Sequence, residues 1–357
     1  MHRTAHPDTL HDLLKKLSPK QLSRIRHKMI TRLIRMKCLA PFRLLKLYYM
    51  IAIDGTGHVT YKQRYCPHCL TKEKDGKVLY YYHNVLEAKI VADNGLALSV
   101  ETEFIENTIK YTKQDCELKA FYGLVKRLKK KFLQLKICLL LDGLYVADPV
   151  FKIIDKYRWK YIITFKEGSM PDTYAEYLCL KSLCPEKRGE IKDKNIIQNY
   201  NWVNGISYRG PVFDVLECNE SKTNNRDEIK NTRFVWITNL LVRKRNFIKI
   251  ARGGRLRWKI ENEGFNIQKN RGYNLEHSFS KNEVAMKNYY LLLQIAHTIS
   301  QLMEKSLLKN NIEKVFGSIT NVFFKLLEEL RARLFCQKDL EKYILKPFQI
   351  RLSYAPS

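Results

Sequence analysis

Two near-continuous apolar runs stand out along the chain, at Leu47–Ile53 and Leu135–Leu141, and Asp-Gly follows each of them directly. Their length and their lack of polar alternation predict strands that are buried on both faces of a sheet. The glycine in each dipeptide allows the chain to turn sharply. We therefore expect Asp54 and Asp142 to project from the ends of two core strands, although a single aspartate in such a position can also serve only to cap the next turn.

A third carboxylate lies on a segment with helical spacing. Apolar residues recur at near-helical intervals across Arg255–Asn270, and Gly253-Gly254 indicates where that helix starts. At about 100° per residue, Arg257 and Glu261 share one face of it. One interpretation is an ordinary surface Arg–Glu pair. The other is that Glu261 joins the two aspartates at the sheet edge, where three hard oxygen donors would hold divalent metal ions.

The remaining pattern predicts a mixed α/β fold. The strand, helix, strand order across residues 135–166 predicts parallel pairing. Asn204-Gly205, inside the β-like run Trp202–Ser207, predicts a hairpin turn. Further strands are expected at residues 59–65, 78–82, 85–91, 96–105, 159–166, 212–218 and 234–240. Further helices are expected at residues 10–37, with a break at Ser18-Pro19, and at 115–132, 147–157, 282–303 and 312–348.

The 357 residues are more than one compact core usually holds, so we expect a core with additions. The α/β core is predicted in two parts, interrupted by a β-rich insertion and flanked by helical N- and C-terminal segments. The predicted bounds are 1–44 for a basic helical arm, 45–166 and 234–305 for the core, 167–233 for the insertion and 306–357 for the C-terminal segment. The basic helix of the arm either binds DNA or packs on the core with a solvated face.

The charge of the chain indicates a polyanionic partner. Lysine and arginine number 64 against 36 aspartates and glutamates, which gives a formal net charge of +28. Because this excess is spread along the chain, nucleic acid is favoured over other partners. A membrane surface is the alternative. It is disfavoured because no apolar run approaches the roughly 20 residues that span a bilayer, and the first residues do not resemble a signal peptide.

Nine cysteines without a secretory signal favour a reducing compartment and mostly free thiols. Cys66 and Cys69 form the one pair with the spacing of a metal site, in the run Cys66-Pro67-His68-Cys69. A zinc site would need further ligands, and the nearest candidates are His58, His68 and His83. The alternative interpretation of the run is a tight turn in a hairpin.

Taken together, the order of these segments resembles the ribonuclease-H-like core of DDE-type insertion-sequence transposases. The similarity is greatest to the branch with a large β insertion between the second Asp and the Glu, and it extends over about residues 45–303. The family's pattern also has a Tyr three residues before the Arg and a Lys seven after the Glu, where this chain has Gly254 and Gln268, followed by Lys269. The matching runs are Ile53-Asp54-Gly55-Thr56-Gly57, Leu141-Asp142-Gly143, Trp236-Ile237-Thr238-Asn239, Arg257-Trp258-Lys259-Ile260-Glu261, Glu261–Asn270 and Tyr273-Asn274-Leu275-Glu276-His277.

The resemblance implies a ribonuclease-H-like mixed sheet flanked by helices and an enzyme that cuts and joins DNA at the ends of an insertion sequence. It implies two Mg²⁺ or Mn²⁺ ions held by Asp54, Asp142 and Glu261. Double-stranded DNA, both element ends and target, would be the partner of a homodimer in the cytoplasm of a prokaryotic cell, on the nucleoid. Implied DNA contacts are Arg255, Arg257, Trp258 and Lys269, with Trp258 either stacking on a displaced base or packing in the core.

Three other functions compete with this one: a nuclease of the same fold that cuts without joining, an inactive or partial mobile-element relic that only binds DNA, and a basic structural nucleic-acid-binding protein. One local expectation separates Lys269 from its neighbour. In a regular helix Gln268 lies about 20° from Glu261, whereas Lys269 lies about 80° away. A π-bulge at Gly264 would absorb one residue and turn Lys269 toward Glu261. Alternatively, Gly264 only lets another segment approach closely.

Overall fold

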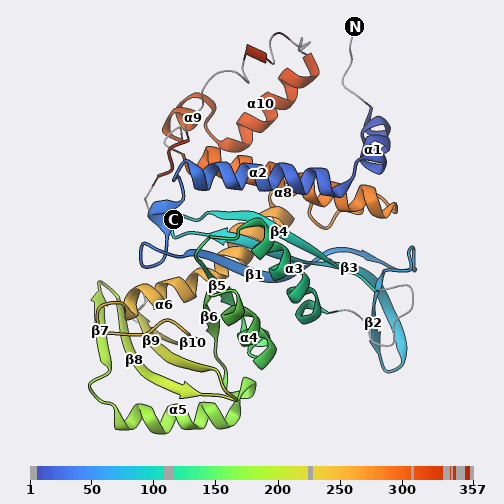
Figure 1. Cartoon of the computed structure of the whole chain (residues 1–357). Coiled ribbons are helices and arrows are strands. Elements are labelled where there is room, and N and C mark those ends of the chain that lie inside the picture. Colours follow the sequence, from blue (N-terminus) through green and yellow to red (C-terminus); the bar gives the residue numbers. More distant parts are fainter. Residues whose placement is uncertain are drawn as a thin grey trace.

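The computed structural model describes residues 6–107, 116–223, 228–306, 309–332, 338, 341–342 and 350–353. Within these ranges the chain forms a ten-stranded mixed sheet with helices packed against it (Figure 1). None of the helices in this described part is long and apolar enough to cross a bilayer. The mixed α/β class expected from the hydrophobic pattern is therefore confirmed.

The strands follow one another across the sheet in the order β2-β3-β1-β5-β6-β10-β9-β8-β7, and β4 pairs with β3. The pairs β1–β5 and β5–β6 are parallel, as predicted for β5 and β6, and the other pairs are antiparallel. The strands are β1 Tyr49–Tyr61, β2 Leu70–Lys74, β3 Lys77–Val91, β4 Ala97–Ile105, β5 Ile137–Leu141, β6 Lys160–Thr164, β7 Arg188–Asp193, β8 Ile196–Ser207, β9 Val212–Thr223 and β10 Ile229–Thr238.

The helices cover the sheet and extend beyond it at the two ends of the chain (Figure 1). They are α1 Pro7–Lys16, α2 Pro19–Arg35, α3 Glu117–Lys131, α4 Asp148–Lys156, α5 Pro171–Leu183, α6 Phe247–Arg255, α7 Asn266–Asn270, α8 Glu283–Glu304, α9 Lys309–Phe316 and α10 Ile319–Ala332. Shorter helical turns are η1 Ala40–Phe42, η2 Gly143–Tyr145, η3 Glu167–Ser169, η4 Leu256–Trp258 and the π-helical η5 Ile260–Phe265.

Strand β1 separates two hydrophobic cores because its side chains alternate between the two faces of the sheet. Ile51 and Ile53 belong to the core that contains residues of α3 and α4. Met50 and Ala52 belong to the core that contains residues of α6 and α8. Neighbouring β5 is fully buried along Ile137–Leu141, as its uninterrupted apolar sequence predicted. The two central parallel strands are thus held rigidly from both sides, which fixes the residues at their carboxyl ends.

The predicted β-rich insertion continues the central sheet instead of forming a separate unit. Its strands β7, β8 and β9 join through β10 to β6, and α5 packs against β8. The hairpin turn predicted at Asn204-Gly205 is wrong, because β8 runs through both residues with an irregularity between Val203 and Ile206. Gly205 takes a positive φ of 79° there, so the Asn-Gly pair makes a bulge rather than a turn. The chain reverses only after Ser207.

The basic N-terminal segment packs on the core, which was one of its two predicted interpretations. Helices α1 and α2 both contact α8, and α2 also contacts β4. Arg26 is 1% exposed, and its guanidinium lies 3.6 Å from Glu87 and 3.8 Å from Glu101, on the neighbouring strands β3 and β4. A buried arginine that holds two carboxylates serves the fold, so Arg26 is not part of a DNA-binding face.

At the C-terminal end, the predicted helix over residues 312–348 is present as α9 and α10 up to Ala332. Most of its remainder, and the first residue of the helix predicted at 115–132, lie outside the described residues. The strands predicted at 59–65 and 85–91 are continuations of others: the first extends β1 to Tyr61, and the second forms β3 together with residues 78–82.

Candidate active site

Asp54, Asp142 and Glu261 line one cavity of about 380 Å³, which we call the carboxylate cavity. Its other residues are Gly55, Thr56, Gly57, Arg257, Trp258, Phe265, Asn266 and Lys269. The three carboxylates come from positions 54, 142 and 261 of the chain, so only the fold brings them together. The convergence expected from the two strands and the helix is therefore present.

The two aspartates lie at the same edge of two adjacent parallel strands. Pairing of β1 with β5 ends at Ala52 and Leu140, and each aspartate follows that point by two residues. Asp142 leaves the strand and caps the next turn, since its Oδ1 accepts the backbone N–H of Leu144 at 2.9 Å. The expectation that Asp54 ends its strand is wrong, because β1 continues to Tyr61 through pairing with β3. Asp142 thus has a capping role as well as a place in the cavity.

Arg257 is the basic partner of this group. Its Nη1 lies 3.2 Å from Oδ2 of Asp54, and the residue as a whole is only 9% exposed. The central carbon of its guanidinium lies 4.8 Å from the centre of the Trp258 ring. Burial raises the pKa of Asp54, Arg257 opposes that rise, and the charges of Asp142 and Glu261 add to it. Three clustered carboxylates with one guanidinium leave an excess of negative charge that a bound cation would relieve.

The segment that carries Glu261 changes helical type three times. It passes from α6 through the 3₁₀ turn η4 and the π-helix η5 into α7. Gly253 and Gly254 lie inside α6, so the prediction that they start the helix is wrong. A Cβ on Gly254 would lie 2.7 Å from Nε1 of Trp236. The glycine therefore lets α6 pack on β10, and a tyrosine has no space at this position.

The π-bulge expected at Gly264 is present, since η5 spans Ile260–Phe265. Gln268 is fully buried, and its amide bonds to Gln294 at 2.9 Å and to His297 at 2.8 Å. Lys269 instead lines the carboxylate cavity, as expected for a helix that contains the bulge. Its ammonium group pairs with Glu276 at 2.8 Å. Close approach at Gly264 also occurs, because an added Cβ would lie 3.1 Å from Cε of the buried Lys89.

The other two residues expected to contact DNA differ in their surroundings. Trp258 is 50% exposed and lines the carboxylate cavity, so the interpretation that it packs in the core is wrong. Arg255 forms a bidentate ion pair with Glu220, with Nη2 3.2 Å from Oε1, and its guanidinium lies 4.6 Å from the ring of Phe234. Arg255 is therefore held against the insertion strands and not toward the three carboxylates.

Glu117, in the first turn of α3, is a carboxylate that the sequence pattern did not identify. A Cβ built on Gly55 would overlap its carboxylate, so Glu117 reaches the chain directly after Asp54. Burial, followed by the charges of Asp54 and Asp142, raises the pKa of Glu117 to about 7. An acidic residue at a helix N-terminus is common, so the sequence around Glu117 carried no signal that it belongs to this group.

A second cavity of about 470 Å³ adjoins the first and shares Asp142, Arg257 and Trp258 with it. We call it the insertion cavity, because strand β10 supplies four consecutive lining residues, Arg233, Phe234, Val235 and Trp236. It adds the exposed Lys166 and Arg233 to the cationic groups near the carboxylates. The shared residues place the insertion cavity next to the acidic cluster.

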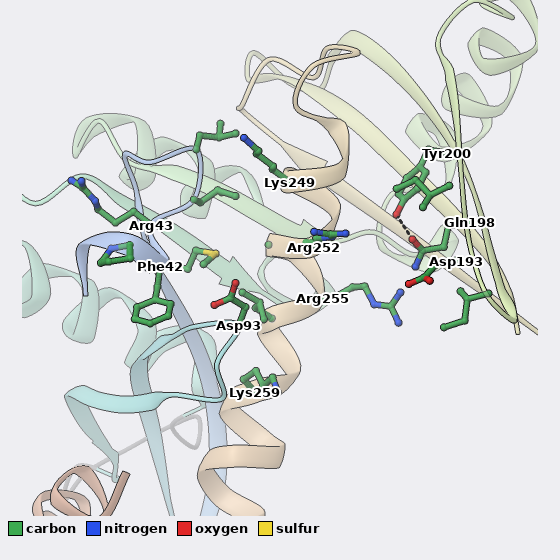
Figure 2. Close-up of a pocket in the computed structure, with 18 residues that line it drawn as sticks. Phe42, Arg43, Asp93, Asp193, Gln198, Tyr200, Lys249, Arg252, Arg255 and Lys259 are labelled. Atoms are coloured by element: carbon green, nitrogen blue, oxygen red, sulfur yellow. Dashed lines mark hydrogen bonds between the residues drawn. The ribbon is translucent and has the colours of Figure 1, made fainter. Parts of the chain in front are cut away.

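A third cavity, of about 500 Å³, lies on the other side of α6 and contains none of the three carboxylates. Figure 2 shows Arg43, Lys249 and Arg252 around it, with Lys259 of the Glu261 segment at one end. Asp93 and Asp193 also line it, so its charge is mixed. Basic side chains outnumber the acidic ones in its lining, so this cavity is a basic surface beside α6.

Cys66, Cys69 and His83 form a separate group. Among the described residues, they are the one set of three histidine, cysteine or carboxylate side chains whose ligand atoms all lie within 4.8 Å of one another. His83 is therefore the member of the three candidate histidines that joins the cysteines. His58 packs against the ring of Tyr290, and Nδ1 of His68 bonds to the carbonyl of Asn107.

No protein-family model matches the chain, and no curated protein matches its sequence.

Proposed function

We propose that the chain is a DNA transposase with a ribonuclease-H-like core, which cleaves the ends of an insertion sequence and joins them to target DNA. The observation that carries this proposal is the convergence of Asp54, Asp142 and Glu261 on one open cavity, beside a nearly buried Arg257. Two aspartates just beyond the point where the pairing of β1 with β5 ends, with a third carboxylate on the helical segment η5, suit metal-dependent attack at phosphorus.

The donor set fits two Mg²⁺ or Mn²⁺ ions. All three ligands are hard oxygens, which Mg²⁺ and Mn²⁺ prefer. Burial, opposed by Arg257 and assisted by Asp142 and Glu261, raises the pKa of Asp54, and a bound cation would favour its charged form. Two such ions would be held among the three carboxylates. Bound there, the ions would activate a water or a DNA 3′-hydroxyl and stabilise the leaving oxygen.

The protein's own groups position the DNA in this proposal. Arg257 orients the Asp54 carboxylate through the 3.2 Å contact and offers its remaining N–H groups to the phosphodiester. Lys269 supplies a second cation at the cavity, once DNA phosphate competes with Glu276 for its ammonium group. Trp258, half exposed between the carboxylate and insertion cavities, offers a face on which an unpaired base can stack.

Double-stranded DNA is the proposed partner, and the net charge of +28 supports it. In this proposal the insertion cavity, with Lys166 and Arg233, receives the strand that leaves the reacting phosphate. A homodimer would pair two element ends, so that each copy acts on one of them.

The test uses purified full-length protein and linear DNA that carries the sequences flanking its coding region. Cleavage at matching inverted repeats in Mg²⁺, followed by joining of pre-cleaved ends to a plasmid, is the expected result. Cleavage without joining would instead identify a nuclease. Binding without cleavage, in Mg²⁺ and in Mn²⁺, would identify an inactive relic.

A further inference from the structure

The segment Cys66–Cys69 forms a tight knuckle between the end of β1 and the start of β2. Strand β3 lies between these two strands, and His83 projects from it at the position that pairs with Val59 of β1. The neighbouring residue of β3, Tyr82, pairs with Leu70 at the start of β2. The knuckle, which connects β1 to β2, therefore passes over β3 close to His83.

Three soft ligand atoms meet at this point. The Sγ atoms of Cys66 and Cys69 are 3.2 Å apart, and each lies 3.3 Å from Nε2 of His83. With Zn–S near 2.3 Å and Zn–N near 2.0–2.1 Å, ligand atoms of a tetrahedral zinc site are about 3.5–3.8 Å apart. The observed separations are shorter than those values by about 0.6 Å or less. A small outward movement of the side chains would admit the ion.

The group is also buried and held in place. Cys69 is fully buried and His83 is 4% exposed, so two of the three ligands are shielded from solvent. The backbone of the knuckle is fixed by Asn107, whose side chain donates to the carbonyl of Cys69 at 2.9 Å. The guanidinium of Arg64 donates to the carbonyl of Pro67 at 2.9 Å from the other side. These two hydrogen bonds hold the backbone of the knuckle in place.

We propose that Cys66, Cys69 and His83 bind one Zn²⁺ ion, and that this ion fastens the knuckle to β3. Two thiolates and an imidazole favour zinc over the hard cations that suit the carboxylate cavity. The fourth tetrahedral position is taken by a water molecule on the side of Cys66, the least buried of the three ligands. None of these residues lines the carboxylate cavity, so this site is independent of the proposed transposase activity.

The competing arrangement is a disulfide between Cys66 and Cys69, which would leave His83 as an ordinary buried imidazole. The experiment therefore centres on His83. Full-length protein is purified under reducing conditions, its zinc content is measured by elemental analysis, and its zinc affinity by competition with a chromogenic chelator. The variants are Cys66→Ser and His83→Gln. The matched control is Cys179→Ser, which changes an exposed cysteine on α5.

We expect one zinc per chain in the unsubstituted protein and in Cys179→Ser, and zinc affinity at least about tenfold lower in both ligand variants. Co²⁺ in place of zinc should give the thiolate charge-transfer band and the intense visible bands of tetrahedral geometry, and His83→Gln should change both. Unaltered affinity in His83→Gln would overturn the proposal, as would metal-free protein with a Cys66–Cys69 disulfide that does not take up zinc after reduction.

A second measurement avoids substitutions that prevent folding. A mercurial reagent added to the unsubstituted protein should release the zinc as it titrates the thiols, with an indicator dye reporting the ion. Release in step with two thiols that react after the exposed Cys116 and Cys179 supports the proposal, because the exposed cysteines hold no metal. Failure to release any zinc overturns it.

Discussion

The carboxylate of Glu117 fills the space that a side chain on Gly55 would need. This contact joins the first turn of α3 to the residue after Asp54, so that a fourth acidic group lies beside the carboxylate cavity. The acidic group at this sheet edge therefore has four members, of which three line the cavity. Substitution of each member can show how much it contributes to the proposed cleavage activity.

The central prediction concerns Asp54→Asn, Asp142→Asn and Glu261→Gln. Each substitution keeps the size of the side chain and removes a metal-binding charge, so Mg²⁺-dependent cleavage should fall by about a thousandfold or more. DNA binding in a gel-shift assay should be retained. Glu263→Gln is the matched control, because Glu263 lies on the same π-helix but pairs with Lys259 at 3.2 Å and does not line the cavity. Full cleavage by any of the first three would remove that residue from the site.

Glu117 should assist the site indirectly. We expect Glu117→Gln to lower the cleavage rate by about tenfold, a smaller loss than for a direct ligand. Gly55→Ala should have the same effect at little cost in stability, because the added methyl group displaces only the flexible end of Glu117. The double variant should then be no worse than either single one. Additive losses in the rates of the three variants would contradict this coupling.

The adjacent residues Gln268 and Lys269 should have opposite phenotypes. Lys269→Ala should lower cleavage and DNA affinity while the melting temperature is unchanged, since the side chain lines the cavity. Gln268→Ala should lower the free energy of unfolding by about 1–3 kcal/mol, because it leaves buried partners unsatisfied. Glu276→Ala is the control for Lys269, as it removes the ion pair and keeps the ammonium group. Normal cleavage by Lys269→Ala would exclude a phosphate contact.

DNA affinity should depend steeply on salt. If six to ten phosphates are neutralised, affinity should fall by about a thousandfold or more between about 50 and 200 mM salt. Arg252→Ala, in the basic cavity beside α6, should reduce the slope of log affinity against log salt by about one. Lys325→Ala on α10, an exposed lysine paired with Glu328, should leave that slope unchanged. A salt-insensitive affinity would contradict the assignment of DNA as the partner.

Stability should fall in acid through Glu217, which is 1% exposed on β9. Burial alone would raise its pKa, but hydrogen bonds from Arg233, Lys181, Tyr177 and Asn219 outweigh burial and lower the pKa to about 2. Its contribution is therefore present above pH 4.5 and is lost as the pH falls toward 2. Glu217→Gln should be less stable at neutral pH and should show a weaker pH dependence in urea unfolding between those limits. An unchanged slope would contradict this role.

The apolar runs before Asp54 and Asp142 were enough to predict two buried strands, each with an aspartate directly after the run. That inference holds because uninterrupted hydrophobic sequence has few stable places other than a sheet covered on both faces. Gly264 likewise marked the π-bulge, since one extra residue was needed to bring Lys269 to the face of Glu261. The spacing of residues within one strand or helix is a local property, so it can be taken from the sequence without knowledge of the fold.

Other features depended on contacts between distant segments, and only the tertiary structure decided them. Glu117 joins the acidic group because α3 packs on β3 and β4 with its first residue reaching Gly55, and no local pattern marks that approach. His83 was one of three equivalent candidates until the register of β3 brought it to the cysteines. The local preference of Asn204-Gly205 is for a turn. Because β8 pairs with β9 on both sides of this dipeptide, the strand continues through it and the two residues form a bulge. In each case the deciding free energy comes from burial and pairing between elements, which a reading of neighbouring residues does not contain.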